Sequence, residues 1–340
     1  MIKLRPLYET IRLLDISDDE YFGENYREYI SNSRLKLINP EQGGSPELYK
    51  EGLGASISDS LIFGSAVHQL VLQPEEFELV HHINRPTAKM GFMADELYAG
   101  HKAGGLSVED IIEASDKVDY YKGKMDDKKV ANVFEACTPY WEGRMDYEST
   151  HTDKTPIYLD EKSREKLQLC LASVEAHNKM QSLLHPTGVL ETPMSMNEAT
   201  LLMDVEADVD GKIIILHLKA KLDNFTADLE QNILTLNDLK TTGHWLSKFK
   251  EDSFLKFHYA RQMSMYLWML RLYAEKELKM KSPEMYANML VVCTCPDYRA
   301  GVCNVTNSEI KQGFEEFKRL LRLVAHCEVY GYDGSMGTDV

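Results

Sequence analysis

The sequence contains no long hydrophobic run and no excess of basic residues. Its 340 residues include 54 acidic and 38 basic side chains, which give a formal net charge of −16. No stretch is long and apolar enough to cross a bilayer, and the first residues lack the hydrophobic region of a signal peptide. We find neither internal repeats nor low-complexity segments. These absences predict a cytoplasmic protein without a membrane partner.

The net acidity argues against nucleic-acid binding, because most proteins that bind nucleic acid carry a basic footprint. A local basic groove nevertheless matters more for a bound strand than the charge of the whole chain. One part of the sequence supplies candidates for such a groove, namely Lys219, Lys221, Lys240, Lys248, Lys250, Lys256 and Arg261.

Two β-hairpins are predicted in the same part of the chain. Residues 201–209 and 212–225 are strand-like and are joined by Asp210-Gly211, a dipeptide that favours tight hairpin turns. Residues 226–232 are polar and indicate a second turn, and 233–241 return as a third strand. The pattern predicts a three-stranded antiparallel meander.

The third strand carries the most informative side chains. Asp238 and Lys240 are two residues apart, so they point to the same face of a strand, whereas Leu239 points to the other. The meander would bring Asp223 of the preceding strand close to Asp238. Two carboxylates beside an ammonium group are able to hold Mg²⁺ and direct a water at a phosphate. The alternative reading is an ordinary surface ion pair.

Two flanking helices offer partners for this site. Residues 58–73 predict a helix that is capped by a serine, ended by Pro74 and buried nearly all round, with His68 on it. Residues 254–278 predict a long amphipathic helix on which Gln262 and Tyr266 share a stripe with Tyr259. A buried Gln262 needs hydrogen-bond partners, which an active-site lysine or a DNA phosphate would supply. Core roles for the histidine and for the stripe are the alternatives.

The order His68, Asp223, Asp238-x-Lys240, Gln262-x-x-x-Tyr266 resembles the PD-(D/E)XK nuclease superfamily. More narrowly, residues 29–40, with their serine-containing helix start and Pro40, and residues 63–77 are similar to RecE-type phage and prophage exonucleases, which are related to the RecB nuclease domain and lambda exonuclease. The resemblance spans roughly residues 29–266.

The resemblance implies an α/β fold with a restriction-endonuclease-like core, in which a central mixed β-sheet with an antiparallel meander is flanked by helices. It implies one elaborated domain over 1–330, with a catalytic core at about 55–300, a helical insertion at about 78–194 and a flexible tail at 331–340. We therefore prefer one domain, although the length alone allows two.

The resemblance also implies roles for the site residues. Asp223, Asp238, His68 and the backbone carbonyl of Leu239 would hold one or two Mg²⁺ ions, for which Mn²⁺ would substitute because histidine is a softer ligand. Lys240 would position the attacking water, and Gln262 and Tyr266 would support it. DNA would be bound by Ser33 and Arg34 at a helix start, where backbone N–H groups favour anions, and by Lys219, Lys221, Lys248 and Arg261.

The activity implied is that of a metal-dependent exonuclease that degrades linear double-stranded DNA from its ends, 5′ to 3′, and leaves 3′ single strands for recombination. Its partners would be DNA ends, a single-strand annealing protein and further copies of the chain in a ring-shaped trimer or tetramer, in a bacterial host or encoded by a phage. A structure-specific or restriction-type endonuclease, and a non-catalytic DNA-binding or assembly protein on the same fold, are the alternatives.

Other candidate residues are weaker. Glu191 and Glu206 lie on or near strands, and we expect structural roles for both. Some nucleases of the superfamily hold an iron–sulfur cluster on four cysteines, but the spacing Cys293-x-Cys295 is poor for a tetrahedral site. We expect the six cysteines to be reduced thiols and no iron–sulfur cluster to form.

Overall fold

The computed structural model describes residues 2–52, 58–121, 125–151, 153–186, 194–295 and 297–333. The chain divides into two compact units: Met1–Ser56 with Ser173–Val340, and Ile57–Ala172. The inserted segment therefore begins and ends earlier than the predicted 78–194, and it contains His68. Glu191 and most of the predicted tail at 331–340 lie outside the described residues.

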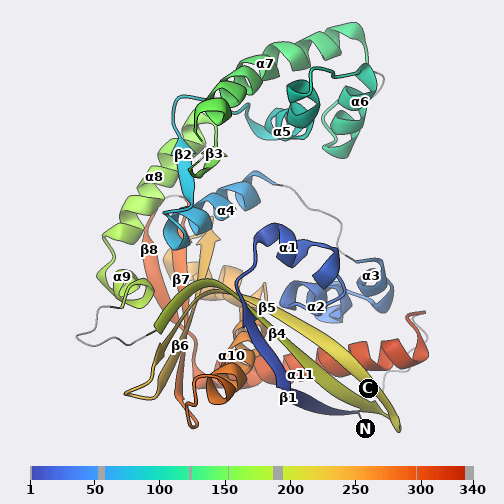
Figure 1. Cartoon of the computed structure of the whole chain (residues 1–340), viewed down its shortest axis with the longest axis vertical. Helices are drawn as coiled ribbons and strands as arrows, with labels where there is room; N and C mark the ends of the chain where they lie inside the picture. Colours follow the sequence, from blue (N-terminus) through green and yellow to red (C-terminus); the bar gives the residue numbers. More distant parts are fainter. Residues whose placement is uncertain are drawn as a thin grey trace. The chain divides into compact units, whose positions relative to one another are not determined.

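The first unit is built on a six-stranded sheet with the strand order β1-β4-β5-β6-β7-β8 (Figure 1). Its strands are β1 (Lys3–Leu14), β4 (Met194–Val209), β5 (Lys212–Asp228), β6 (Ile233–Thr242), β7 (Glu284–Cys293) and β8 (Ala300–Asn304). Strands β6 and β7 are parallel, and the other neighbours are antiparallel. The sheet is thus mixed and contains the antiparallel β4–β5–β6 meander, which confirms the predicted α/β class.

The β4–β5 turn forms at the predicted dipeptide. Asp210 and Gly211 have φ angles of 52° and 86°, as a tight hairpin turn with two left-handed residues requires. Strand β5 runs three residues further than predicted, to Asp228, so the second turn is correspondingly shorter.

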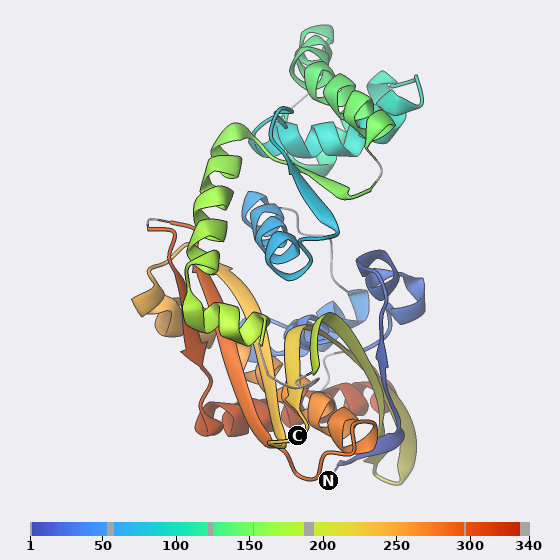
Figure 2. The same ribbon diagram turned by 60° about the vertical axis from the view of Figure 1, so that its left-hand side comes forward.

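Two long helices pack along one face of this sheet, as Figure 2 shows in orange and red. Helix α11 (Asn307–Tyr330) begins with a capping box between Thr306 and Glu309, which satisfies backbone N–H groups of its first turn. Helix α10 (Tyr259–Lys276) begins later than the predicted residue 254. The preceding residues form a short π-helix, η4 (Lys250–Leu255), and His258 adopts a left-handed backbone with φ 54° that separates η4 from α10.

The smaller elements of the first unit connect these layers. They are α1 (Asp18–Phe22), η1 (Glu24–Tyr26), α2 (Asn32–Ile38), η2 (Pro40–Gln42), α3 (Pro46–Glu51), α9 (Asn178–Leu184) and η3 (Leu246–Lys248). Helix α2 packs against both α10 and α11.

A row of asparagines, three of them buried, fixes the register of the meander. Asn288 donates to the side-chain oxygen of Asn237 (3.0 Å), Asn237 to Asn224 (2.7 Å) and Asn224 to Asn197 (2.7 Å), so one amide row crosses four adjacent strands. A slip of one residue would turn these amides to the other face and leave them without partners. Asp223 is adjacent to Asn224 on β5, and Asp238 is adjacent to Asn237 on β6. The row therefore holds the two aspartates at the same level of the sheet.

The second unit is mainly helical. It contains α4 (Asp59–Leu72), α5 (Ala88–Lys102), α6 (Val108–Lys117), α7 (Asp127–Thr150), most of α8 (Glu161–Glu175) and the parallel pair β2 (Phe77–Val80) and β3 (Thr155–Tyr158). Trp141, fully buried, lies in its core and donates to the backbone oxygen of Ala94 (2.7 Å).

Helix α4 matches the prediction at its ends but not in its burial. Ser58 caps it by accepting from the backbone N–H of Leu61 (3.3 Å), and it ends before Pro74. Ala66, Val67, Val71 and Leu72 are buried, whereas Leu61 is 55% exposed, so the helix has one buried side. Across the described ranges of both units, no helix combines the length and apolar character needed to cross a membrane.

Candidate active site

The candidate site lies where β5 and β6 stop pairing. The backbone ladder between the two strands runs from Asp228 opposite Ile233 to Asn224 opposite Asn237. Just beyond the last pair, the backbone N–H of Leu239 donates to the Asp223 side chain (2.7 Å to Oδ2). A carboxylate thus takes the place of a strand carbonyl at the point where the ladder ends.

Lys240 joins the two aspartates. Its Nζ lies 2.6 Å from Asp238 Oδ2 and 3.7 Å from Asp223 Oδ2. It also donates to the backbone oxygen of Leu239 at 3.2 Å. The side chains are 1% (Asp238), 13% (Asp223) and 18% (Lys240) exposed, so the charges are poorly screened by water. We call these three residues the Lys240 cluster.

Helix α10 supports this cluster from the side. Gln262 donates its amide to Asp238 Oδ1 (2.7 Å), so the partner of the buried amide is a carboxylate. Hydrogen bonding of Gln262 to a lysine or to a DNA phosphate stays a prediction. Lys240 Nζ lies 5.7 Å from the centre of the Tyr259 ring, and Tyr266 is 8% exposed one helical turn beyond Gln262.

The charges of the cluster set its protonation states. Burial by itself would lower the pKa of Lys240, but Asp238 and Asp223 outweigh burial and raise that pKa above its ordinary value. Burial raises the pKa of Tyr266 well above its ordinary value, and the two aspartates add to the rise. At neutral pH, Lys240 is thus a permanent cation and Tyr266 a neutral hydrogen-bond donor.

Glu198 is an acidic neighbour that the sequence analysis did not find. It lies on β4 across from Asp223, with carboxylate oxygens of the two residues within 4.8 Å of one another. Its backbone has φ 52°, an irregularity inside a long strand that no local sequence signal announces. Burial and Asp223 raise the pKa of Glu198 to about 7, against the opposing effect of Lys221. Glu206, one of the two candidates that we considered structural, pairs with Arg5 instead (2.7 Å).

The donor set fits a hard divalent cation. Asp223, Asp238 and the Leu239 carbonyl offer oxygen ligands of the kind that Mg²⁺ prefers. The carboxylates of Asp223 and Asp238 share the single ammonium group of Lys240. Glu198 adds a third carboxylate, and its partner Lys221 (2.7 Å) is itself shared with Asp18. The surplus of negative charge favours a cation. His68 lies on α4 in the second unit, so its role as a further ligand stays a prediction.

Two residues predicted to contact DNA are buried. Lys219 is 5% exposed, donates to the backbone oxygen of Tyr21 (2.8 Å) and lies 4.2 Å from the centre of the Tyr21 ring. Arg261 is 1% exposed and donates to Asn32 (2.9 Å) and Gln42 (2.8 Å). The prediction that these two residues contact DNA is wrong, because their cationic groups are enclosed by protein.

The other predicted DNA contacts lie closer to the surface. Arg34 donates to the backbone oxygen of Arg27 (2.6 Å) and to Glu28 (2.9 Å), and Ser33 is hydrogen-bonded to Ser31 (2.9 Å). Lys248 is exposed and pairs with Glu251 (2.8 Å). DNA binding by these residues and by Lys221 stays a prediction.

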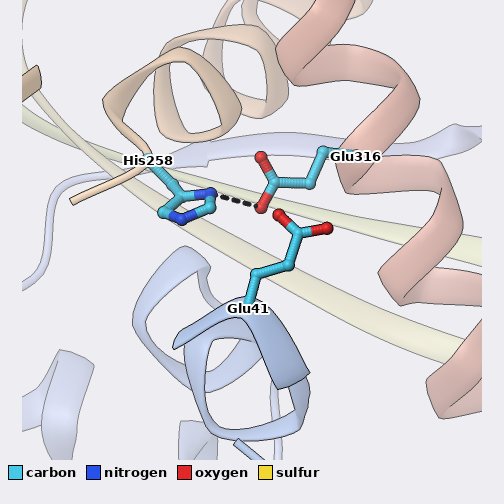
Figure 3. Close-up of side chains that lie close together, drawn as sticks. All are labelled: Glu41, His258 and Glu316. Carbon is cyan, nitrogen blue, oxygen red and sulfur yellow. Dashed lines mark hydrogen bonds and ion pairs between the residues drawn. The ribbon is translucent and has the colours of Figure 1, made fainter. Parts of the chain in front are cut away.

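A second group of acidic residues surrounds Arg261. Glu316 Oε1 accepts from His258 Nδ1 (2.9 Å), Arg261 (2.9 Å) and Asn39 (3.0 Å), and Glu41 lies beside the same histidine (Figure 3). Glu41 itself pairs with Arg319 (3.0 Å). We call Glu41, His258, Arg261 and Glu316 the His258 cluster. Arg261 balances the charge of Glu316, and Arg319 balances that of Glu41. Three donors already bond one oxygen of Glu316, so this cluster connects η2 to α10 and α11 and does not favour a metal ion.

The comparisons with known proteins do not assign a family. No protein-family model matches the sequence, and no curated protein is similar to it. A solved structure of a "putative exonuclease" from Eubacterium rectale aligns with a TM-score of 0.45 and 11% sequence identity. The alignment covers 92% of this chain and 88% of the Eubacterium rectale chain. Rai1 from Scheffersomyces stipitis, in complex with 3′-NADP⁺ and calcium, aligns with a TM-score of 0.24 and 9% sequence identity. The alignment covers 97% of this chain and 84% of the Rai1 chain. Both TM-scores are below 0.5, so the fold and the site rest on the contacts described above.

Proposed function

We propose that this chain is a metal-dependent deoxyribonuclease that degrades linear double-stranded DNA from its ends. The observation that carries the proposal is the convergence of Asp223 and Asp238 on Lys240, at 3.7 and 2.6 Å, with Gln262 bonded to Asp238. Two carboxylates and a lysine on adjacent strands are able to hold Mg²⁺ and direct a water at a phosphodiester, and the set agrees with the resemblance to RecE-type exonucleases.

The aspartates and the Leu239 carbonyl would hold Mg²⁺ or Mn²⁺, one or two ions in number, with His68 as a further ligand. When bound, the ion would supply Lewis-acid polarisation of the phosphate and a lowered pKa for water. The remaining work falls to the protein. Lys240, held as a cation by the aspartates, would orient the attacking water and stabilise the charge that builds on the phosphate.

Gln262 would act as a positioning residue. Its amide holds Asp238 Oδ1, which leaves Oδ2 directed toward Lys240. Tyr266, held neutral by burial, would donate a hydrogen bond without competing as an anion for the metal. Neither group needs to change its protonation state during the reaction.

The finer features of the proposal rest on the resemblance alone. They are 5′ to 3′ polarity, production of 3′ single strands for a single-strand annealing protein, and assembly into a ring-shaped trimer or tetramer. Strand polarity is measured with substrates labelled at one end, and the number of chains with light scattering of the purified protein.

The deciding experiment compares 5′-phosphorylated linear duplex DNA with covalently closed circular duplex, in Mg²⁺ and in EDTA, for the wild type and Lys240→Ala. Loss of the linear DNA alone, dependent on metal and on Lys240, is the expected result. Cutting of the circle would replace the exonuclease with an endonuclease. A folded protein that binds DNA and cleaves neither substrate would support the non-catalytic alternative.

A further inference from the structure

An exposed patch of apolar and basic side chains lies at the end of η4, just before α10. Leu255 and Phe257 are 64% and 44% exposed, and the residue between them, Lys256, is also exposed. The Lys256 ammonium lies 5.6 Å from the centre of the Phe257 ring, within the range of a cation–π contact. Apolar side chains that are exposed beside one another form a candidate contact surface. We call Leu255, Lys256 and Phe257 the Phe257 patch.

The Phe257 patch is continuous with the Lys240 cluster. The Phe257 ring centre lies 5.8 Å from that of Tyr259, and the Tyr259 ring lies 5.7 Å from Lys240 Nζ. Two aromatic rings therefore lead from the surface to the lysine of the candidate site. A chain whose phosphate reached Lys240 would place a neighbouring nucleotide along this path.

The backbone holds the patch in a fixed position. The patch begins at the last residue of the π-helix η4, a rare conformation that recurs at functional sites, and ends just before the left-handed His258. The unfavourable backbone of His258 is maintained by surrounding contacts, because its Nδ1 is 2.9 Å from Glu316 (Figure 3). The His258 cluster thus anchors the end of a segment that projects Phe257 toward solvent.

The chemistry of the patch selects one occupant. The Phe257 ring is 44% exposed and has a lysine beside it, and the path from it ends at Lys240, in the site proposed to hold a divalent cation. This arrangement matches an unpaired nucleobase and its phosphates, since every base has a face that stacks on an aromatic ring. We propose that the Phe257 patch is a stacking platform for an unpaired base of the DNA strand that enters the site, with Lys256 beside the phosphate backbone. The platform rests on the proposed function, because it is defined by its distance from Lys240.

The test is the binding of a single-stranded oligonucleotide that contains 2-aminopurine, measured in EDTA so that no metal-dependent cleavage occurs. Fluorescence anisotropy gives the affinity, and quenching of 2-aminopurine reports stacking. We expect Phe257→Ala to weaken binding about fivefold to a hundredfold and to remove the quenching. Phe257→Tyr should retain both signals, and Phe257→Leu, which keeps an apolar side chain without a ring, should not.

Tyr286→Ala is the matched control. Tyr286 is 45% exposed, against 44% for Phe257, and lies opposite Thr235 on the sheet, five residues away along β6 from Lys240. It should bind like the wild type. Lys256→Gln should reduce the salt dependence of binding by roughly one ion, and it serves as an independent variant if the Phe257 variants fail to fold.

Unchanged affinity and quenching in folded Phe257→Ala would overturn the platform. A change of oligomeric state in this variant without a change in DNA binding would also overturn it, and would assign the patch to a protein interface. If Phe257→Ala does not fold, an unchanged salt dependence for Lys256→Gln overturns it. A wild type that cleaves DNA while Phe257→Ala binds normally removes the platform only. A wild type that shows quenching but no cleavage in Mg²⁺ removes the proposed nuclease function and keeps the platform.

Discussion

The Lys240 and His258 clusters contain similar residues in different balance. Each places two carboxylates next to one cationic side chain in the same compact unit. In the His258 cluster, Arg261 and Arg319 match Glu316 and Glu41. In the Lys240 cluster, one ammonium faces Asp223 and Asp238, and the nearby Glu198 has its pKa raised to about 7 by burial and by Asp223.

The difference shows that proximity of acidic groups does not define a metal site. A carboxylate that is matched by an arginine and saturated with donors stabilises the fold, whereas carboxylates in excess over cations gain from binding one. The comparison therefore assigns structure to one cluster and chemistry to the other. The predictions below test that assignment, beginning with the largest effect.

Lys240→Ala should lower the turnover of linear DNA by at least about a hundredfold, because it removes a charge aimed at the developing negative phosphate. It should also lower the melting temperature in EDTA, since two aspartates then lack their cation, and Mg²⁺ should restore that temperature by binding the folded state. Digestion of linear DNA measures the turnover, and calorimetry with and without Mg²⁺ measures the two melting temperatures. Full turnover in the variant would remove Lys240 from the mechanism.

Arg261→Ala should destabilise the protein by about 3–5 kcal/mol, because Glu316 loses its principal cation in a buried network. Mg²⁺ should not restore this stability, in contrast to Lys240→Ala. Denaturant unfolding in both conditions measures the difference. Arg319→Ala is the control, since its ion pair with Glu41 is 42% and 62% exposed and should contribute about 1 kcal/mol or less. Recovery of Arg261→Ala in Mg²⁺ would instead identify a metal site in the His258 cluster.

His68→Ala should weaken metal affinity about tenfold to a hundredfold, the range found when a group that supports a metal site is lost. This variant asks whether the Lys240 cluster takes a ligand from the second unit. Isothermal titration with Mn²⁺ measures the affinity, and thermal unfolding in EDTA is the control. A variant that loses stability but keeps its metal affinity would make His68 a core residue.

Asp223→Asn should raise the stability of the metal-free protein by on the order of 1 kcal/mol, because it relieves repulsion with Asp238 and Glu198. It should weaken Mg²⁺ binding at the same time. The melting temperature in EDTA distinguishes the cases, and a lower value than that of the wild type would show that the Lys240 cluster carries no surplus of negative charge.

Local patterns predicted the strands of the candidate site well. Alternation placed Asp238 and Lys240 on one face of β6, and Asp210-Gly211 located the hairpin turn. Both inferences depend on chemistry within a few residues. The same reasoning extended α10 back to residue 254, because the amphipathic pattern continues through η4 and gives no sign of the left-handed His258.

The partners of charged residues could not be predicted in this way. Lys219 and Arg261 lie near the site in sequence, yet Tyr21 and Glu316 enclose them from segments far along the chain. Glu198 was missed for the same reason, because it reaches Asp223 only through the pairing of β4 with β5.

By itself, the sequence determined the α/β class, the meander and the residue types at the end of β6, since strand periodicity and turn chemistry are local properties. Only the tertiary structure decided which carboxylates are matched by cations, where the inserted unit begins and which basic residues remain at the surface. Those outcomes depend on burial and on contacts between distant segments, because the free energy of a charge is set by everything packed around it.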